Sequence, residues 1–137
     1  MKLIDVYTEP RAADLLWALL AERPAAANIS HRKMPSYDEH MAFIASQPYA
    51  HWYLIDVGAE DYAGAIYLTP AREIGIGIFK RYWGFGHGKM AIQLLRAKHP
   101  GRMLANVAPR NFVSQTMFMD LGFKLLSHTY ELQEATP

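Results

Sequence analysis

The chain has 137 residues, of which 51% are hydrophobic and 20% charged, and this mix predicts one folded domain over 1–137 rather than a disordered or fibrous chain. The formal net charge of +1 argues against a broad basic surface for nucleic acid, and no apolar run is long enough for a membrane span or signal peptide. Cysteine is absent, which excludes disulfides, cysteine-ligated zinc and a catalytic thiolate. We therefore expect a soluble cytoplasmic protein with small-molecule partners, no nucleic acid and no membrane.

The first third of the sequence predicts one strand and two helices. A β-prone run at 3–7 is followed by 11–23, where leucines recur at helical spacing until a proline stops the pattern. The segment 25–35 has no clear period, and we expect a loop or an irregular helix there. Ser36 with Glu39 three residues later is a capping-box pattern, which predicts the start of the second helix.

The rest of the sequence alternates strands and helices. Three β-rich runs at 52–57, 62–68 and 73–79 are expected to be antiparallel neighbours, because short turn-like connections separate them. Beyond a glycine cluster the pattern predicts a helix up to Pro100, a strand at 103–107, a helix from Asn111 to Gly122, and closing strands at 123–126 and 129–132.

The predicted order of elements is β-α-α-β-β-β-α-β-α-β-β. This order combines hairpins with strand-helix-strand crossovers, which favours an α/β fold over an all-β or all-α fold. The predicted sheet is mixed but mostly antiparallel, with about seven strands and with helices on both faces.

The stretch most informative about function joins the 73–79 run to a helix through Arg81-x-x-Gly84-x-Gly86-x-Gly88. Glycines let the backbone turn sharply and approach a ligand, while the first turn of a helix presents unpaired N–H groups and a partial positive charge. Together they bind phosphate oxygens, so the expected ligand group is a pyrophosphate. The same glycines could equally serve a tight turn or close helix–strand packing.

The same stretch carries Arg81, His87 and Lys89, which add positive charge around a bound anion. For His87, an exposed loop histidine is the plainer interpretation.

Other nucleotide-binding motifs fit this stretch less well. A dinucleotide fold would place its glycines after the first strand, and a P-loop would follow its lysine with Ser or Thr where this chain has Met90.

Over nearly its whole length the sequence resembles the GNAT N-acetyltransferases, most closely from Glu73 to Phe123. In that family a Gln/Arg-x-x-Gly-x-Gly/Ala signature binds the pyrophosphate of coenzyme A, and Arg81-x-x-Gly84-x-Gly86 matches it. Two linked signatures make the resemblance specific. The second is a helix that flanks the coenzyme, and it is similar to Asn111-x-x-Ser114, Phe118 and Leu121-Gly122-Phe123.

The resemblance implies that acetyl-CoA is the co-substrate. A backbone N–H near Ile78 would polarise the thioester carbonyl. Asn111 would contact the pantetheine arm, cap its helix, or do both, and Ser114 would reach the coenzyme or simply be tolerated in the helix. The coenzyme-binding residues so implied are Ile78, Phe79, Arg81, Gly84, Phe85, Gly86, His87, Gly88, Lys89, Asn111, Ser114 and Phe118.

Two positions bear on proton transfer. Glu73 resembles the position of the general base in some family members, acting directly or through a water, and the alternative is a solvated carboxylate at the strand end. Phe118 stands where many members carry a tyrosine that protonates the leaving thiolate, and it has no proton to give. The candidates for the general acid are then water, Tyr82, Tyr130 and a residue of the segment 28–40. The alternative is that the thiolate leaves without specific protonation.

The acceptor amine is expected to bind at the first two helices and the loop between them. Arg32 and Lys33 would suit an acidic or phosphate-bearing acceptor, whereas Glu39 would suit a cationic amine. His31 and His40 are too far apart for a metal pair on one helix, so no metal site is predicted.

The leading prediction is an acetyl-CoA-dependent N-acetyltransferase that modifies a primary amine of a small molecule, an amino sugar or a protein N-terminus by direct attack on the thioester. One alternative is a coenzyme-A-binding sensor or interaction module without catalysis, which Phe118 favours. Another is a phosphate-binding module unrelated to coenzyme A. A homodimer is expected by analogy, because dimers are common in the family.

Overall fold

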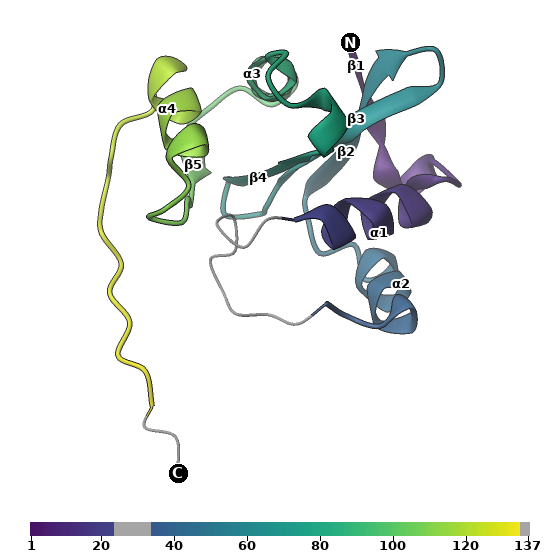
Figure 1. Cartoon of the computed structure of the whole chain (residues 1–137), viewed down its shortest axis with the longest axis horizontal. Helices are drawn as coiled ribbons and strands as arrows, with labels where there is room; N and C mark the ends of the chain where they lie inside the picture. Colours follow the sequence, from purple (N-terminus) through teal and green to yellow (C-terminus); the bar gives the residue numbers. More distant parts are fainter. Residues whose placement is uncertain (24–33, 135–137) are drawn as a thin grey trace.

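A five-stranded mixed sheet with helices on both faces organises the protein in a computed structural model, which describes residues 1–23 and 34–134 (Figure 1). The strands lie in the order β1-β2-β3-β4-β5. All neighbouring pairs are antiparallel except β4 and β5, which are parallel. The predicted mixed α/β fold with helices on both faces is therefore confirmed. The strands are β1 (Lys2–Asp5), β2 (His51–Gly58), β3 (Asp61–Leu68), β4 (Glu73–Ile78) and β5 (Leu104–Ala105).

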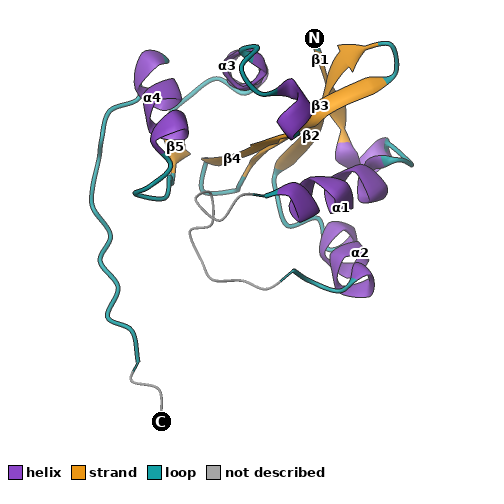
Figure 2. Ribbon diagram, in the orientation of Figure 1, coloured by secondary structure: helices purple, strands orange, loops and turns teal. Residues whose placement is uncertain are grey.

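The helices form two layers (Figure 2). On one face lie α1 (Ala12–Glu22) and α2 (Tyr37–Ala45), which cover a core that includes Leu16, Trp52 and Leu54. On the other face lie α3 (His87–Lys98) and α4 (Phe112–Asp120), which cover a core that includes Ile92 and Phe118. In the described part of the chain, the short 3₁₀ helices η1 (Val6–Thr8) and η3 (Lys80–Tyr82) connect neighbouring elements. Within the described ranges, no helix has the length and apolar character needed to cross a bilayer.

Local chemistry explains several boundaries. The Asp5 side chain accepts the backbone N–H of Tyr7 at 2.9 Å, and this turn ends the first strand earlier than the sequence pattern predicts. The predicted capping box is confirmed, because Ser36 Oγ accepts from Glu39 N at 3.1 Å and Glu39 Oε1 accepts from Ser36 N at 3.4 Å. Gly122 has a φ of 94°, the left-handed conformation that commonly ends a helix.

The C-terminal part differs from the prediction. The strand expected at 103–107 is reduced to Leu104–Ala105, and the closing strands expected at 123–126 and 129–132 are wrong, because Phe123–Glu134 forms neither helix nor strand. The expected apolar face of α4 is also only partly buried, since Phe112 and Val113 are exposed. A β-prone composition forms a strand only where another strand is available to pair with it, and composition alone does not supply that partner. The tail expected to fray after Glu134 lies outside the described residues.

Candidate functional site

A glycine loop connects β4 to α3 and leaves the first turn of that helix open. Gly84 and Gly86 have φ values of 84° and 78°, and nothing lies within 4 Å of where a Cβ would stand on either. Gly86 is the N-cap of α3, and no side chain among the described residues caps the helix there. The N–H groups of the first turn therefore lack a side-chain cap among the described residues and lie at the positive end of the helix dipole, an arrangement that suits an anion.

Gly88 has a different role from the other two glycines. It lies inside α3, where a Cβ would come 3.0 Å from Met117 Sδ and 3.8 Å from Ile76 Cδ1. The missing side chain lets α3 approach α4 and β4 closely. The alternative that these glycines serve packing thus applies to Gly88, whereas Gly84 and Gly86 shape the turn.

The Arg81 side chain points back to the β2–β3 hairpin. Its Nη2 lies 3.1 Å from Asp61 Oδ1 and 3.4 Å from the carbonyl of Tyr62, and its guanidinium carbon lies 4.6 Å from the ring centre of Phe79. About half of the side-chain surface of Arg81 and Asp61 is exposed (52% and 43%), so this pair is a weak surface ion pair. Arg81 thus fixes η3 to the hairpin, and a bound phosphate would compete with Asp61 for it.

Tyr82 donates a short hydrogen bond to Asp61 Oδ2. This bond is the largest cause that lowers the pKa of the Asp61 carboxyl, and it is also the largest cause that raises the pKa of the Tyr82 phenol. A phenol whose proton is already held by a carboxylate is a poor proton donor to a leaving group. Tyr82 is one of the candidate general acids from the sequence, and its hydroxyl is instead hydrogen-bonded to the β2–β3 hairpin.

Phe85 of the loop and His87 and Lys89 of the first turn of α3 have separate surroundings. His87 is half-buried, with its ring 5.3 Å from that of Tyr82, and its Nδ1 is buried without a hydrogen-bond partner in the described structure. It is therefore not the exposed loop histidine that the plainer interpretation expected. Lys89 Nζ lies 3.0 Å from Asp120 Oδ2, which ties α3 to α4. Phe85 is exposed.

Alternate amides in the second half of β4 point away from β3. Phe79 N donates to the β3 backbone at 2.8 Å, and the Glu73 carbonyl accepts from the N–H just after β3 at 2.9 Å. Alternate residues of an antiparallel pair exchange backbone hydrogen bonds, so the N–H groups of Ile76 and Ile78 point the other way, toward β5. Pairing with β5 ends at Ile74. Within the described ranges no strand covers this edge, which leaves two backbone donors beside the glycine loop.

One face of β4 carries almost no side chains. A Cβ on Gly75 would lie 1.9 Å from Tyr67 Cζ, and a Cβ on Gly77 would lie 3.3 Å from Leu19 Cδ2, so both glycines face α1 and its core. Because side chains alternate along a strand, Glu73 points to the same face. The Tyr67 ring and the Leu19 side chain fill the space over these two glycines, so on this face of β4 Glu73 alone among these alternate residues carries a side chain.

The position of Glu73 limits its role. Among the described residues, no hydrogen bond or ion pair engages its carboxylate. Ile78 lies five residues further along β4, about 17 Å at the usual strand rise, whereas Ile76 is three residues or about 10 Å away. A base role for Glu73 therefore requires an intervening water or a thioester held near Ile76.

The second predicted segment, at α4, contributes a helix cap and a core side chain. Asn111 Oδ1 accepts from Ser114 N at 3.2 Å, so the N-cap interpretation of Asn111 is confirmed. Phe118 is 7% exposed and packs edge-on against Phe123, with ring centres 5.1 Å apart. A phenyl ring fits this apolar site without the hydrogen-bond partner that a buried tyrosine needs. The predicted coenzyme contacts of these residues are not tested by the geometry and stay predictions.

Only part of the predicted acceptor region is described. Tyr37 Oη donates to Asp14 Oδ1 at 2.7 Å, and Glu39 is engaged in the capping box with Ser36. His40 is 2% exposed, with its Nε2 2.9 Å from a backbone carbonyl of α1, so it joins the two helices. The remaining residues considered for acid or acceptor roles, Asn28, His31, Arg32 and Lys33, lie outside the described residues.

Sequence reasoning missed two contributors to this site. Asp61 holds Arg81 and Tyr82, and Trp83 Nε1 donates to the Ile78 carbonyl at 2.8 Å, which fixes the turn that follows β4. Asp61 lies about twenty residues before the loop, and no local pattern links a hairpin carboxylate to it. The tryptophan gave no signal either, because Trp83 is 50% exposed and an exposed indole N–H can bond to water instead.

Solved structures share the fold of this chain. An acetyltransferase from Thermus thermophilus superposes with a TM-score of 0.71 at 20% sequence identity, covering 90% of this chain and 86% of that chain. A spermidine N-acetyltransferase SpeG chimera from Vibrio cholerae and hSSAT gives a TM-score of 0.73 at 15% identity, with 93% and 84% covered. The chain has the GNAT acetyltransferase fold. A putative acetyltransferase from Bacillus subtilis, YycN, shares this GNAT fold over 98% of this chain and 99% of its own, with a TM-score of 0.61 at 16% identity.

No family model and no curated protein matches the sequence. The likeness therefore lies in the tertiary structure. In this chain β4 and β5 are parallel and are joined through α3, and the glycine loop lies between β4 and that helix.

Proposed function

We propose that the protein is an acetyl-CoA-dependent N-acetyltransferase that transfers an acetyl group to a primary amine of a small molecule, an amino sugar or a protein N-terminus. The observation that carries this proposal is the uncapped N-terminus of α3, reached from β4 through left-handed Gly84 and Gly86. That turn suits the two adjacent phosphates of a pyrophosphate, because the N–H groups of an uncapped helix start are donors for phosphate oxygens. The GNAT fold of the chain supports the same function.

Acetyl-CoA supplies an activated acyl group as its thioester. The N–H of Ile76 or Ile78 on the open edge of β4 donates to the thioester oxygen and stabilises the negative charge that develops there. The neutral amine attacks the carbonyl carbon, the carbon–sulfur bond breaks, and the proton of the amine passes to Glu73 through water. The thiolate leaves without a tyrosine donor at position 118, and water supplies its proton.

Specific observations favour a second candidate, a coenzyme-A-binding module that does not catalyse transfer. The phenol of Tyr82 is committed to Asp61, and position 118 holds a buried phenylalanine. Tyr130 is 90% exposed and lies on a segment that runs away from the loop (Figure 1). The coenzyme-binding features of the loop do not depend on any of these acids.

Calorimetry and a turnover assay separate the candidates. The purified protein is titrated with acetyl-CoA and with ATP, and thiol release is then followed across amines that include polyamines, amino sugars and peptides. Binding of acetyl-CoA in preference to ATP, with thiol release for at least one amine, is the expected result. Binding without release for any amine would support the non-catalytic module, and equal binding of ATP would refute both candidates in favour of a general phosphate site.

A further inference from the structure

The side chain of Tyr67 on β3 lies directly over the backbone of β4. The two strands pair Tyr67 with Gly75, and a Cβ on Gly75 would lie 1.9 Å from Tyr67 Cζ and 2.2 Å from its hydroxyl oxygen. Because a Cβ stands about 1.5 Å from its Cα, the hydroxyl oxygen lies within about 4 Å of the Gly75 Cα. Only a residue without a side chain leaves room for the phenol at this position.

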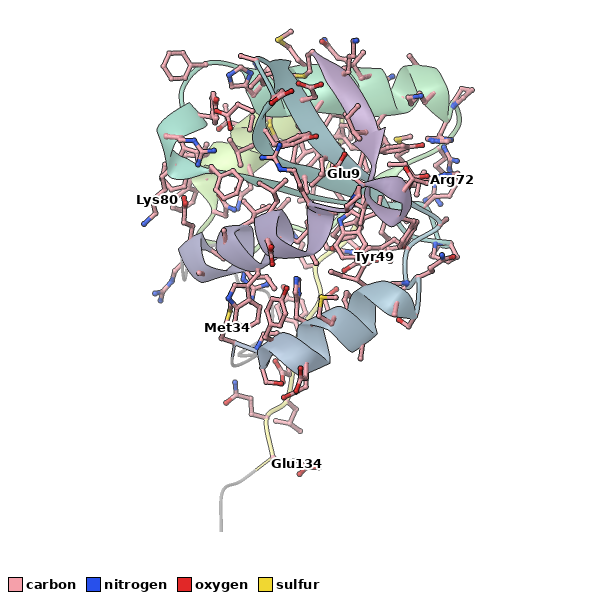
Figure 3. All side chains as sticks on the ribbon, turned by 90° about the vertical axis from the view of Figure 1, so that its right-hand side faces the viewer. Glu9, Met34, Tyr49, Arg72, Lys80 and Glu134 are labelled. Carbon is pink, nitrogen blue, oxygen red and sulfur yellow. The ribbon has the colours of Figure 1, made fainter. Side chains whose placement is uncertain are left out.

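The ring of Tyr67 is held in place by Tyr49. Figure 3 shows Tyr49 on the same side of the sheet as α1 and α2, and both tyrosines pack on the core that these helices cover. The two rings are nearly parallel, with centres 3.7 Å apart and planes at 5°. Trp52 packs edge-on against Tyr49, with ring centres 4.7 Å apart. This packing fixes the direction in which the phenol of Tyr67 points.

The hydroxyl of Tyr67 is available to a ligand. Within the described ranges no hydrogen bond engages it, and the polar side-chain atom that is both buried and unpartnered there is His87 Nδ1. The half-buried Tyr67 therefore presents its hydroxyl to solvent. Other tyrosines use their hydroxyls in hydrogen bonds within the fold, namely Tyr7, Tyr37, Tyr53 and Tyr82.

The carboxylate of Glu73 is a neighbour of this hydroxyl. Glu73 lies two residues before Gly75 on the same face of β4, which makes it a diagonal neighbour of Tyr67 across the strand pair. Diagonal Cβ atoms are about 7–8 Å apart, within reach of aromatic and long side chains. Glu73 also makes no side-chain hydrogen bond or ion pair in the described chain. A phenol and a carboxylate without partners thus share one face of the sheet.

The phenol lies closer than the carboxylate to the backbone donor at Ile76. Tyr67 covers Gly75, the residue directly before Ile76, whereas Glu73 is three residues or about 10 Å from Ile76. A thioester bound by the N–H of Ile76 would therefore hold its carbonyl carbon nearer to the hydroxyl of Tyr67. The hydroxyl occupies the interval that a proton must cross to reach Glu73.

We propose that Tyr67 is a catalytic residue that accepts the proton of the acceptor amine and passes its own phenol proton to Glu73. This inference rests on the proposed function and puts a fixed hydroxyl in the place of the water that carries the proton. The amine nitrogen bonds to the carbonyl carbon and the carbon–sulfur bond breaks, while the proton on nitrogen moves to Tyr67 Oη and the phenol proton moves to Glu73. The thiolate then takes a proton from water, and Glu73 returns its proton to the resulting hydroxide.

Two matched variants test this role. Tyr67→Phe removes the hydroxyl and keeps the ring on Tyr49, and Tyr62→Phe makes the same change elsewhere on β3, in the same core. For Tyr67→Phe, kcat of thiol release is expected to fall at least about tenfold, because general acid–base catalysis contributes about 100-fold or more and water replaces a lost hydroxyl only in part. Its acetyl-CoA affinity by calorimetry and its melting temperature should match those of the wild type. Tyr62→Phe should keep the wild-type value of all three quantities.

A double variant separates proton transfer from a structural effect. If the two residues form one path, Tyr67→Phe/Glu73→Gln should be no more than about threefold slower than Glu73→Gln alone, whereas independent effects would multiply. A full rate in Tyr67→Phe, an equal loss in Tyr62→Phe, or a multiplied loss in the double variant would each overturn this role and leave the proposed function intact. A wild-type chain that releases no thiol with any amine would overturn the proposed function and this role together.

Discussion

Replacing Gly86 with alanine tests whether the left-handed turn before α3 binds the coenzyme. Gly86 has a φ of 78° and open space where a Cβ would stand, so alanine causes backbone strain and no steric clash. Forcing an L-residue into this conformation costs about 1–2 kcal/mol. If acetyl-CoA requires the turn as it stands, the dissociation constant should rise about 5- to 30-fold, because 1.4 kcal/mol corresponds to a factor of ten.

Gly58 provides the matched control. It also has a left-handed φ, 98°, and open space at its Cβ position, but it lies at the end of β2. It lines a surface hollow with Lys2 and Arg11 that includes no residue of the glycine loop. Gly58→Ala should therefore lower the melting temperature by a similar amount and leave coenzyme binding unchanged.

Isothermal titration with acetyl-CoA and thermal unfolding of both variants measure the two effects separately. Wild-type affinity in Gly86→Ala would refute the role of the turn, since the strain would have no effect on binding. Equal weakening in both variants would show that general destabilisation, rather than the loop, controls affinity.

Three further predictions concern proton transfer and pH. Glu73→Gln should slow thiol release about 100-fold or more without changing acetyl-CoA affinity, as expected for loss of a general base, and an unchanged rate would exclude that role. Tyr82→Phe should keep wild-type turnover but lower the melting temperature, because the phenol binds Asp61; a large loss of turnover would mean that it donates a proton. Burial is the largest cause that lowers the pKa of His99 below its ordinary 6.5, so the unfolded chain takes up the proton more readily. The free energy of unfolding should keep this contribution above pH 6.5 and lose it as the pH falls through the lowered pKa of His99. Urea denaturation of His99→Gln should show a weaker dependence of that free energy on pH in the same range.

The sequence could predict features that depend on neighbours along the chain. The capping box of Ser36 and Glu39 and the N-cap role of Asn111 rest on contacts within three residues. The strands β2 to β4 pair with their neighbours in chain order through short connections. The left-handed turn at Gly86 belongs to the same class, since only glycine adopts that backbone conformation at little cost. The mixed α/β fold followed from these elements and their order.

Features that depend on distant residues were decided by the tertiary structure alone. The sequence suggested Arg81 as a phosphate contact and Tyr82 as an acid, but both are held by Asp61 of the hairpin. It also suggested two closing strands, which lack a partner in the described chain. A hydrogen bond or a strand pair needs both members, and the sequence of one segment determines what that segment can bind, while the fold determines what lies within its reach.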